Sequence, residues 1–186
     1  MILVTGGSRS GKSEYAEQLT MAMGSRYLYL ATAKITDAEM ARRVEKHRAR
    51  RSASWTTHEG YTELEKVIAD AAGKYDGMLL DSISTMVTNL LFDFIGNVDW
   101  DTFDFADVDY KAAETFITEQ FEVLGRSAAK LKVPLVAVTD EIGLGVIPET
   151  VLGRAFRDIL GLVNQRMASY ADEVFFVVSG IPVKIK

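Results

Sequence analysis

Cysteine is absent from the 186 residues, and proline and histidine are scarce, with three and two residues respectively. The lack of cysteine excludes disulfides, thiolate nucleophiles and thiolate metal sites, and it is compatible with a reducing cytoplasm. No apolar run approaches the roughly 20 residues that a membrane-spanning helix needs. The apolar start at residues 1–4 is too short for a signal peptide and has no basic flank. We therefore expect a cytoplasmic protein without a transmembrane segment.

The chain also has no excess of positive charge, because its formal net charge is −5. Overall charge therefore does not favour nonspecific binding to nucleic acid, and no nucleic-acid partner is expected. Apolar residues make up 48% of the chain, which is enough to bury a substantial core. The length, together with the lack of internal repeats and low-complexity linkers, predicts a single domain over residues 1–186.

Strand and helix patterns alternate along the chain, which is typical of an α/β protein. The predicted strands cover residues 1–5, 26–32, 77–80, 133–139, 173–179 and 183–186. The predicted helices cover residues 13–23, 36–50, 62–72, 84–94, 110–130 and 148–170. The short link at residues 180–182 predicts a terminal hairpin, which would place one antiparallel strand at the edge of the sheet.

Residues 6–13 carry the phosphate-binding pattern G-x-x-x-x-G-K-S, between a predicted strand and a predicted helix. The glycines let successive backbone N–H groups face phosphate oxygens, and the start of the helix adds partial positive charge. Lys12 is expected to reach the β- and γ-phosphates, and the Ser13 hydroxyl is expected to ligate Mg²⁺. The predicted nucleotide-binding residues of this P-loop are Gly6, Gly7, Ser8, Arg9, Ser10, Gly11, Lys12 and Ser13.

A P-loop needs a second carboxylate on the metal side, commonly at the end of a neighbouring strand. Asp81 follows the apolar run of residues 77–80 and fits this role, with a helix N-cap as the alternative because a helical pattern follows. The P-loop alone does not name the reaction, since kinases, ATPases and GTPases share it. The chain has no N-K-x-D motif, so a switch-type GTPase is not favoured. The small size favours a small-molecule kinase over a mechanical ATPase.

His47 lies in the predicted helix at residues 36–50, on the same face as Met40 and Val44. Six of the 21 lysines and arginines surround it within residues 42–51. A neutral imidazole is a competent nucleophile toward phosphorus, and nearby cations stabilise charge growing on a phosphate. Taken alone, the residues favour a solvated basic helix face with a half-buried histidine. His58 has a weaker context, near a strand end or loop, and is interpreted as structural.

Two further features leave alternatives open. Arg154 and Arg157, one helical turn apart, would grip a substrate phosphate or pair with Glu149 or Asp158. Residues 93–109 hold six aspartates, together with Trp100, Phe103 and Phe105. A solvated loop whose aromatic side chains pack on the body or on a neighbouring subunit is preferred there to a metal site, because the spacing does not suit one.

Nine different short motifs are distributed along the whole chain. They read ILVTGG (2–7), YLATA (29–33), DAEM (37–40), WTTHE (55–59), TMVTNLL (85–91), TDEIG (139–143), FRD (156–158), VNQR (163–166) and VSGI (178–181). With the P-loop and the basic stretch around His47, they resemble the bifunctional adenosylcobinamide kinase/adenosylcobinamide-phosphate guanylyltransferases of cobalamin biosynthesis. The P-loop is generic, whereas the combination over essentially the whole chain is specific.

The resemblance implies that His47 is the guanylylated histidine, which reverses the interpretation drawn from the residues alone. It leaves His47 and Lys12 as the expected catalytic residues, with Ser13 and Asp81 on the metal. The implied nucleotide contacts beyond the P-loop are Ala31, Thr32, Ala33, Arg48, Ala49, Arg50, Arg51, Glu59 and Asp81. Two positions depart from the family pattern. Ser8 replaces a common alanine, and Asp140 replaces a usual asparagine and adds a carboxylate.

The implied fold is a RecA-like P-loop α/β fold: a mostly parallel sheet with helices on both faces and an antiparallel C-terminal edge strand, assembled as a homotrimer. The implied enzyme phosphorylates adenosylcobinamide with ATP or GTP and Mg²⁺. It then transfers GMP from GTP, through a guanylyl-histidine, to adenosylcobinamide phosphate. One alternative is a P-loop kinase for another small molecule, with His47 structural. The other is a nucleotide-dependent regulatory module that needs no acceptor.

Overall fold

The computed structural model describes residues 1–34 and 54–186, so the predicted helix at residues 36–50 lies outside the described residues. The described strands are β1 (Ile2–Gly6), β2 (Tyr27–Ala31), β3 (Trp55–Glu59), β4 (Gly77–Asp81), β5 (Leu135–Asp140), β6 (Glu173–Val178) and β7 (Ile181–Lys184). The described helices are α1 (Lys12–Met21), α3 (Leu64–Ala71), α4 (Ile83–Ile95), α5 (Tyr110–Ala129) and α6 (Val151–Tyr170), with a short 3₁₀ helix η1 (Phe105–Asp107). The boundaries lie within three residues of those predicted for the same elements.

The strands form one sheet in the order β3-β2-β4-β5-β1-β6-β7. Among the described strands, the pairs from β3 to β6 are parallel, and only the terminal pair of β6 and β7 is antiparallel. The predicted antiparallel edge strand is therefore confirmed, as is the mostly parallel sheet. Parallel strands need crossover connections, and the described connections that follow β1, β3, β4 and β5 each run through helices that cover the sheet.

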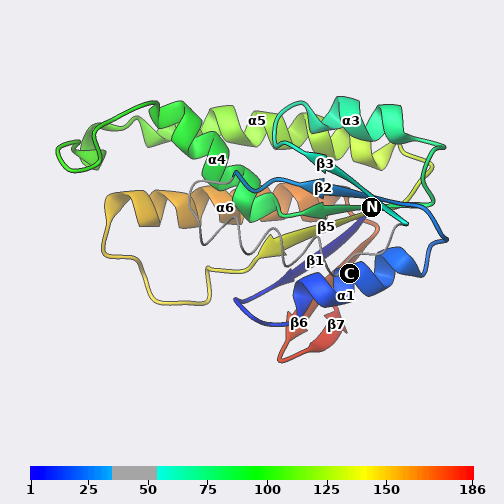
Figure 1. Ribbon diagram of the computed structural model, residues 1–186. Helices are drawn as coiled ribbons and strands as arrows, with labels where there is room; N and C mark the ends of the chain where they lie inside the picture. The colour runs from blue at the N-terminus through cyan, green and yellow to red at the C-terminus, as the bar shows by residue number, and fades with distance from the viewer. Residues whose placement is uncertain (35–53) are drawn as a thin grey trace.

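Alternate residues of the central strands pack into two cores, one on each face of the sheet. Leu30, Leu80 and Ala137 face the larger core, which α3, α4, α5 and α6 complete. Leu79 and Val136 face the smaller core, to which α1 contributes. Figure 1 shows the same layering, with α3, α4 and α5 above the sheet and α1 on the opposite side. Helices on both faces of the sheet are thereby confirmed.

The edge strand β3 is absent from the predicted strands, since the region around His58 was interpreted only as a strand end or loop. Its sequence, WTTHE, has no alternation of apolar and polar residues, and Thr56, Thr57 and Glu59 are exposed. Its main apolar anchor is Trp55, whose ring centroid lies 4.8 Å from that of Tyr27 and 6.2 Å from that of Tyr29. The parallel backbone pairing with β2 therefore stabilises this strand more than its side chains do.

None of the helices in the described parts of the chain is long and apolar enough to cross a membrane. The most apolar of them, α4, has only 13 residues, fewer than the roughly 20 that a membrane span requires. Helix α5 and helix α6 have 20 residues each, and each carries exposed charged positions along its length. These helices are amphipathic covers of the sheet.

Asp76 joins the turn after α1 to the start of β4. Its carboxylate accepts hydrogen bonds from the backbone N–H groups of Ser25 (2.9 Å) and Arg26 (3.0 Å) and from the Arg26 guanidinium (3.2 Å). These bonds, the one from the Ser25 N–H first, lower the pKa of Asp76 to about 2. A carboxylate with a lowered pKa stabilises the folded state above its unfolded pKa, near 3.9, and this stabilisation is lost as the pH falls toward 2.

Replacing Asp76 with asparagine is expected to lower the free energy of unfolding at pH 6. It should also make the loss of stability between about pH 4 and pH 2 shallower than in the wild type, because the titrating carboxyl is gone. Urea unfolding at several pH values measures both effects. Asp70→Asn on the exposed side of α3 is the matched control. Equal acid sensitivity of Asp76→Asn and wild type would contradict this role for Asp76.

Candidate nucleotide-binding site

The P-loop joins the carboxyl end of β1 to the first residue of α1. Gly11 caps α1 in the left-handed conformation, with a φ of 92° that favours glycine, and no side chain of the described residues caps the helix. The first N–H groups of α1 are therefore free of a side-chain cap and available to an anion. A side chain at Gly6 would place its Cβ 2.5 Å from the Val177 carbonyl oxygen. The two glycines thus fit the loop closely between β6 and α1.

The tip of the β6–β7 hairpin braces the P-loop from outside. The Gly180 N–H donates to the Ser10 carbonyl oxygen at 2.7 Å. A Cβ on Gly11 would lie 3.2 Å from the Gly180 Cα, so the two backbones are in close contact. The Ser10 hydroxyl is buried and has no hydrogen-bond partner among the described residues. This bracing uses a carbonyl oxygen of the loop and none of its N–H groups.

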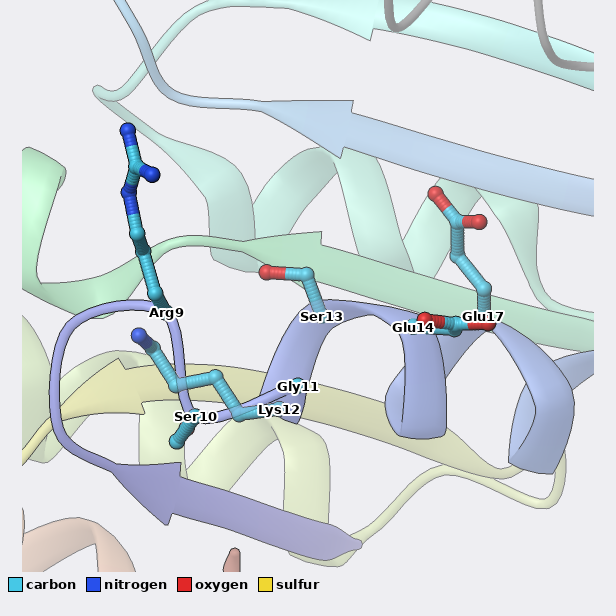
Figure 2. Close-up of a pocket in the computed structure, with 7 residues that line it drawn as sticks. All are labelled: Arg9, Ser10, Gly11, Lys12, Ser13, Glu14 and Glu17. Carbon is cyan, nitrogen blue, oxygen red and sulfur yellow. The ribbon is translucent and has the colours of Figure 1, made fainter. Parts of the chain in front are cut away.

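A hollow of about 860 Å³ lies over the P-loop and the start of α1, lined by Arg9, Ser10, Gly11, Lys12, Ser13, Glu14 and Glu17. Figure 2 shows the Lys12 side chain folded back over the loop, with Ser13 at the start of the helix. The Lys12 Nζ donates to the Gly7 carbonyl oxygen at 3.2 Å. Five of the eight predicted P-loop residues, Arg9 to Ser13, therefore line one hollow.

Asp140, which the sequence singles out as a carboxylate in place of a usual asparagine, is a charged neighbour of the P-loop. Its Oδ1 lies 2.5 Å from the Lys12 Nζ, and its Oδ2 accepts a hydrogen bond from the Ser84 hydroxyl. Residue pairing places Asp140 beside Gly6 at the carboxyl edge of the sheet. Its position directly after the apolar β5 is the same pattern that singled out Asp81 after β4. Applied consistently, that pattern would have identified both carboxylates.

Asp81 ends β4 and accepts a hydrogen bond from the Tyr29 hydroxyl at 2.7 Å. The alternative interpretation, in which Asp81 caps the following helix, is wrong. Ser82 is the N-cap of α4, and its hydroxyl accepts from the Thr85 N–H at 3.2 Å. The carboxylate of Asp81 is therefore not used as a cap.

The carboxyl ends of β3, β2 and β4 place two more predicted residues, Ala31 and Glu59, in one row with Asp81. Ala31 pairs with Glu59 on one side and with Asp81 on the other. Thr32, which follows, is fully buried, and its N–H, hydroxyl and carbonyl oxygen all bond to protein groups. Thr32 therefore shapes this edge, and its own polar groups are not free to meet a ligand. Ala33 directly follows it.

The remaining predicted nucleotide contacts lie outside the described residues. They are Arg48, Ala49, Arg50 and Arg51, and the predicted nucleophile His47 lies there too. Glu59, by contrast, lies in the described part of the chain. Its side chain is exposed at the end of β3 and interacts with another group of the protein. The structure thus brings together the P-loop residues and the row at Ala31, Glu59 and Asp81, on the same edge of the sheet.

A polar cluster beside Ala33 also escaped sequence reasoning. Tyr61 donates to Asp93 at 2.7 Å, and the Lys34 Nζ lies 3.4 Å from both the Tyr61 hydroxyl and the Asp93 carboxylate. These contacts, the hydrogen bond with Tyr61 first, raise the pKa of Lys34. A hollow of about 570 Å³ lies against Lys34, Asp93 and Phe92. No sequence pattern joins residues so far apart, so only the fold reveals the cluster.

The two open features are partly resolved. Arg157 pairs with Asp158 (3.2 Å), and Arg154 donates to the carbonyl oxygens of Pro148 and Glu149 instead of a carboxylate. In the loop after α4, the ring of Trp100 packs against those of Phe92 and Phe105 at centroid distances of 5.2 and 5.1 Å. Trp100 therefore joins the loop to α4 and to a second loop aromatic, although it is itself 54% exposed.

The P-loop between β1 and α1, with the parallel sheet behind it, defines a P-loop nucleotide-binding protein. The family model for cobinamide kinase / cobinamide phosphate guanyltransferase matches residues 2–185. The chain belongs to this family, whose members are bifunctional kinase and guanylyltransferase enzymes. The class and the family both agree with the expectation from the sequence.

Curated relatives match over nearly their whole length. The bifunctional adenosylcobalamin biosynthesis protein CobU of Escherichia coli (strain K12) is 46% identical over 186 residues, covering all of this chain and 99% of the relative. CobU of Salmonella typhimurium (strain LT2) has the same identity and coverage. CobP of Pseudomonas aeruginosa (strain PAO1), also named a bifunctional adenosylcobalamin biosynthesis protein, is 34% identical, covering 99% of this chain and 96% of the relative.

Solved structures of two other proteins match this chain with much lower sequence identity than these relatives. The RadB recombinase matches with a TM-score of 0.43 and 16% identity, covering 94% of this chain and 72% of that one. The P4 protein of bacteriophage phi6 in complex with ADP matches with a TM-score of 0.38 and 13% identity, covering 97% and 53%.

Proposed function

We propose that this protein phosphorylates adenosylcobinamide with ATP or GTP and then transfers GMP from GTP to adenosylcobinamide phosphate, giving adenosylcobinamide-GDP. The observation that carries the proposal is a formed P-loop, with Lys12 and Ser13 at the start of α1, in a chain that belongs to this family. The names of the relatives, bifunctional adenosylcobalamin biosynthesis proteins, support the same substrates.

In the kinase step, the hydroxyl oxygen of the aminopropanol arm attacks the γ-phosphorus, and a new O–P bond forms. The bond from the γ-phosphorus to the bridging oxygen breaks, and its electron pair leaves with the nucleoside diphosphate, while the hydroxyl proton goes to solvent. Lys12 and the amides of the P-loop neutralise charge on the β- and γ-phosphates. The protein contributes mainly positioning and electrostatic stabilisation in such a step.

Mg²⁺ fits the oxygen donors at this site. The Ser13 hydroxyl and the Asp81 carboxylate are hard ligands of the type that Mg²⁺ prefers, and phosphate oxygens and water complete its shell in kinases. The described residues hold no group of three or more His, Cys, Asp or Glu that would bind a metal without the nucleotide. When bound, Mg²⁺ would neutralise charge on the phosphates, and Ser13 and Asp81 would hold it.

In the second step, a ring nitrogen of His47 attacks the α-phosphorus of GTP, and pyrophosphate leaves. A phosphate oxygen of adenosylcobinamide phosphate then attacks the same phosphorus and releases His47. Splitting the substitution in two lowers each barrier. The row at Ala31, Glu59 and Asp81 supports a nucleotide site beside the P-loop, to which Arg48, Ala49, Arg50 and Arg51 would add contacts and positive charge.

We also propose that residues 1–186 act as one domain in the cytoplasm and assemble as a homotrimer. The support for assembly, besides the family resemblance, is an apolar strip at the sheet edge. Ile181, Val183 and Ile185 are 66%, 49% and 62% exposed, at or beside the terminal strand β7. Exposed apolar residues grouped along one edge strand favour a contact with another chain.

The proposal is tested by incubating the protein with adenosylcobinamide, GTP and Mg²⁺ and following the corrinoids by liquid chromatography and mass spectrometry. The phosphate ester should appear first and the GDP derivative second, and ATP alone should stop at the ester. Chelation with EDTA should prevent both products. An ester without the GDP derivative would leave a kinase only. Nucleotide binding without any product would favour a regulatory module.

A further inference from the structure

The ammonium group of Lys12 is held by two groups of the protein itself. It lies 3.2 Å from the Gly7 carbonyl oxygen and 2.5 Å from the Asp140 carboxylate. The side chains of Lys12 and Asp140 are only 12% and 32% exposed, so water screens this ion pair less than it would a surface pair. Lys12 is also the residue that should meet the β- and γ-phosphates of a nucleotide. The carboxylate and the nucleotide therefore compete for one cation.

Asp140 is fixed in place. Its second carboxylate oxygen accepts from the Ser84 hydroxyl, and Ser84 is buried. Its backbone carbonyl oxygen accepts from the Asn164 amide at 3.0 Å, and Asn164 in turn accepts from Thr139 at 2.6 Å. The N–H of the next residue, Glu141, donates to the Gly6 carbonyl oxygen at 3.0 Å. With both its side chain and its backbone bonded, Asp140 stays beside the P-loop when a nucleotide arrives.

We propose that Asp140 is a positioning residue that sets the nucleotide affinity of the P-loop and couples it to Mg²⁺. In the empty loop it holds Lys12, and in the complex it remains a negative charge beside the terminal phosphates. Repulsion between the Asp140 carboxylate and the phosphates weakens nucleotide binding, most for a triphosphate and least for a monophosphate. Mg²⁺ relieves the repulsion by neutralising the phosphates. This inference rests on nucleotide binding at the P-loop, as proposed above.

The test is Asp140→Asn, which keeps the shape and an acceptor for Ser84 and removes the charge. Calorimetric titration without Mg²⁺ should show GTP binding about tenfold tighter than in the wild type. With Mg²⁺ the gain should shrink to about threefold, and GMP affinity should not change. In the kinase assay the KM for nucleotide should fall while kcat changes less than about threefold. Asp70→Asn, which removes an exposed carboxylate of α3, is the matched control and should leave GTP affinity within about twofold of the wild type.

Asp140→Ser removes the charge with a different side chain and should tighten binding in the same direction, so the test does not depend on the folding of one variant. GTP affinity in both variants equal to or weaker than in the wild type would overturn the inference. So would an equal gain with and without Mg²⁺. Failure of the wild type itself to bind GTP is a different result, because it rejects nucleotide binding at the P-loop.

Discussion

Lys12→Ala is expected to lower kcat for phosphorylation of adenosylcobinamide by about 10²–10³-fold, the usual result of removing one preorganised group that stabilises transition-state charge. Lys12 is the cation at the mouth of the P-loop, between the Gly7 carbonyl oxygen and Asp140. Without it, the charge that spreads over the γ-phosphoryl oxygens has only the loop amides and the metal. Initial rates of ester formation at saturating nucleotide measure the effect.

The same variant should bind GTP more weakly, because Asp140 then faces the phosphates without its cation. Adding Asp140→Asn to Lys12→Ala should restore much of the affinity and little of kcat, which separates charge repulsion from catalysis. Lys66→Ala on α3, an exposed lysine paired with Glu63, is the matched control and should leave both quantities unchanged. Ester formation by Lys12→Ala near the wild-type rate would remove the P-loop from the kinase reaction.

Much of the fold was predictable because its helices and strands carry strong local patterns. Strands β1, β4 and β5 are continuous apolar runs, as expected for strands covered on both faces, and their predicted positions were right to within two residues. Strand β3 was only partly anticipated, because an edge strand with exposed threonines lacks both apolar alternation and an apolar run. The order of strands depends on long-range pairing, which no local pattern encodes.

The site was predictable where one contiguous motif carries it and not where contacts join distant segments. The P-loop is contiguous, so residues 6–13 could be assigned from their spacing. The contact of Lys12 with Asp140 spans 128 positions, and the cluster of Lys34, Tyr61 and Asp93 spans three separate segments. Asp81 was placed at the right edge, yet its neighbour Ser82 was needed to decide that the helix cap is not Asp81. Contacts between residues so far apart in the sequence can be identified only when the pairing of the strands is known.

His47→Ala is expected to divide the two proposed activities. Wild-type protein incubated with GTP and Mg²⁺, without acceptor, should gain a GMP-sized mass that acid removes and base does not, as for a phosphorus–nitrogen bond on histidine. The variant should show no such adduct, and its transfer of GMP to adenosylcobinamide phosphate should fall at least about 10³-fold, since a covalent route needs its nucleophile. Phosphorylation of adenosylcobinamide should persist, because Lys12, Ser13 and the loop amides are unchanged.

His58→Ala is the matched control, because His58 is the only other histidine in the chain. It lies in β3, next to Glu59, so it also tests whether this strand tolerates a change beside the proposed nucleotide row. The adduct should form in His58→Ala and be absent in His47→Ala. An adduct that persists in His47→Ala and disappears in His58→Ala would move the nucleophile to β3. No adduct in the wild type, with GTP bound normally, would reject the covalent intermediate and leave direct attack of the acceptor on GTP as the remaining route.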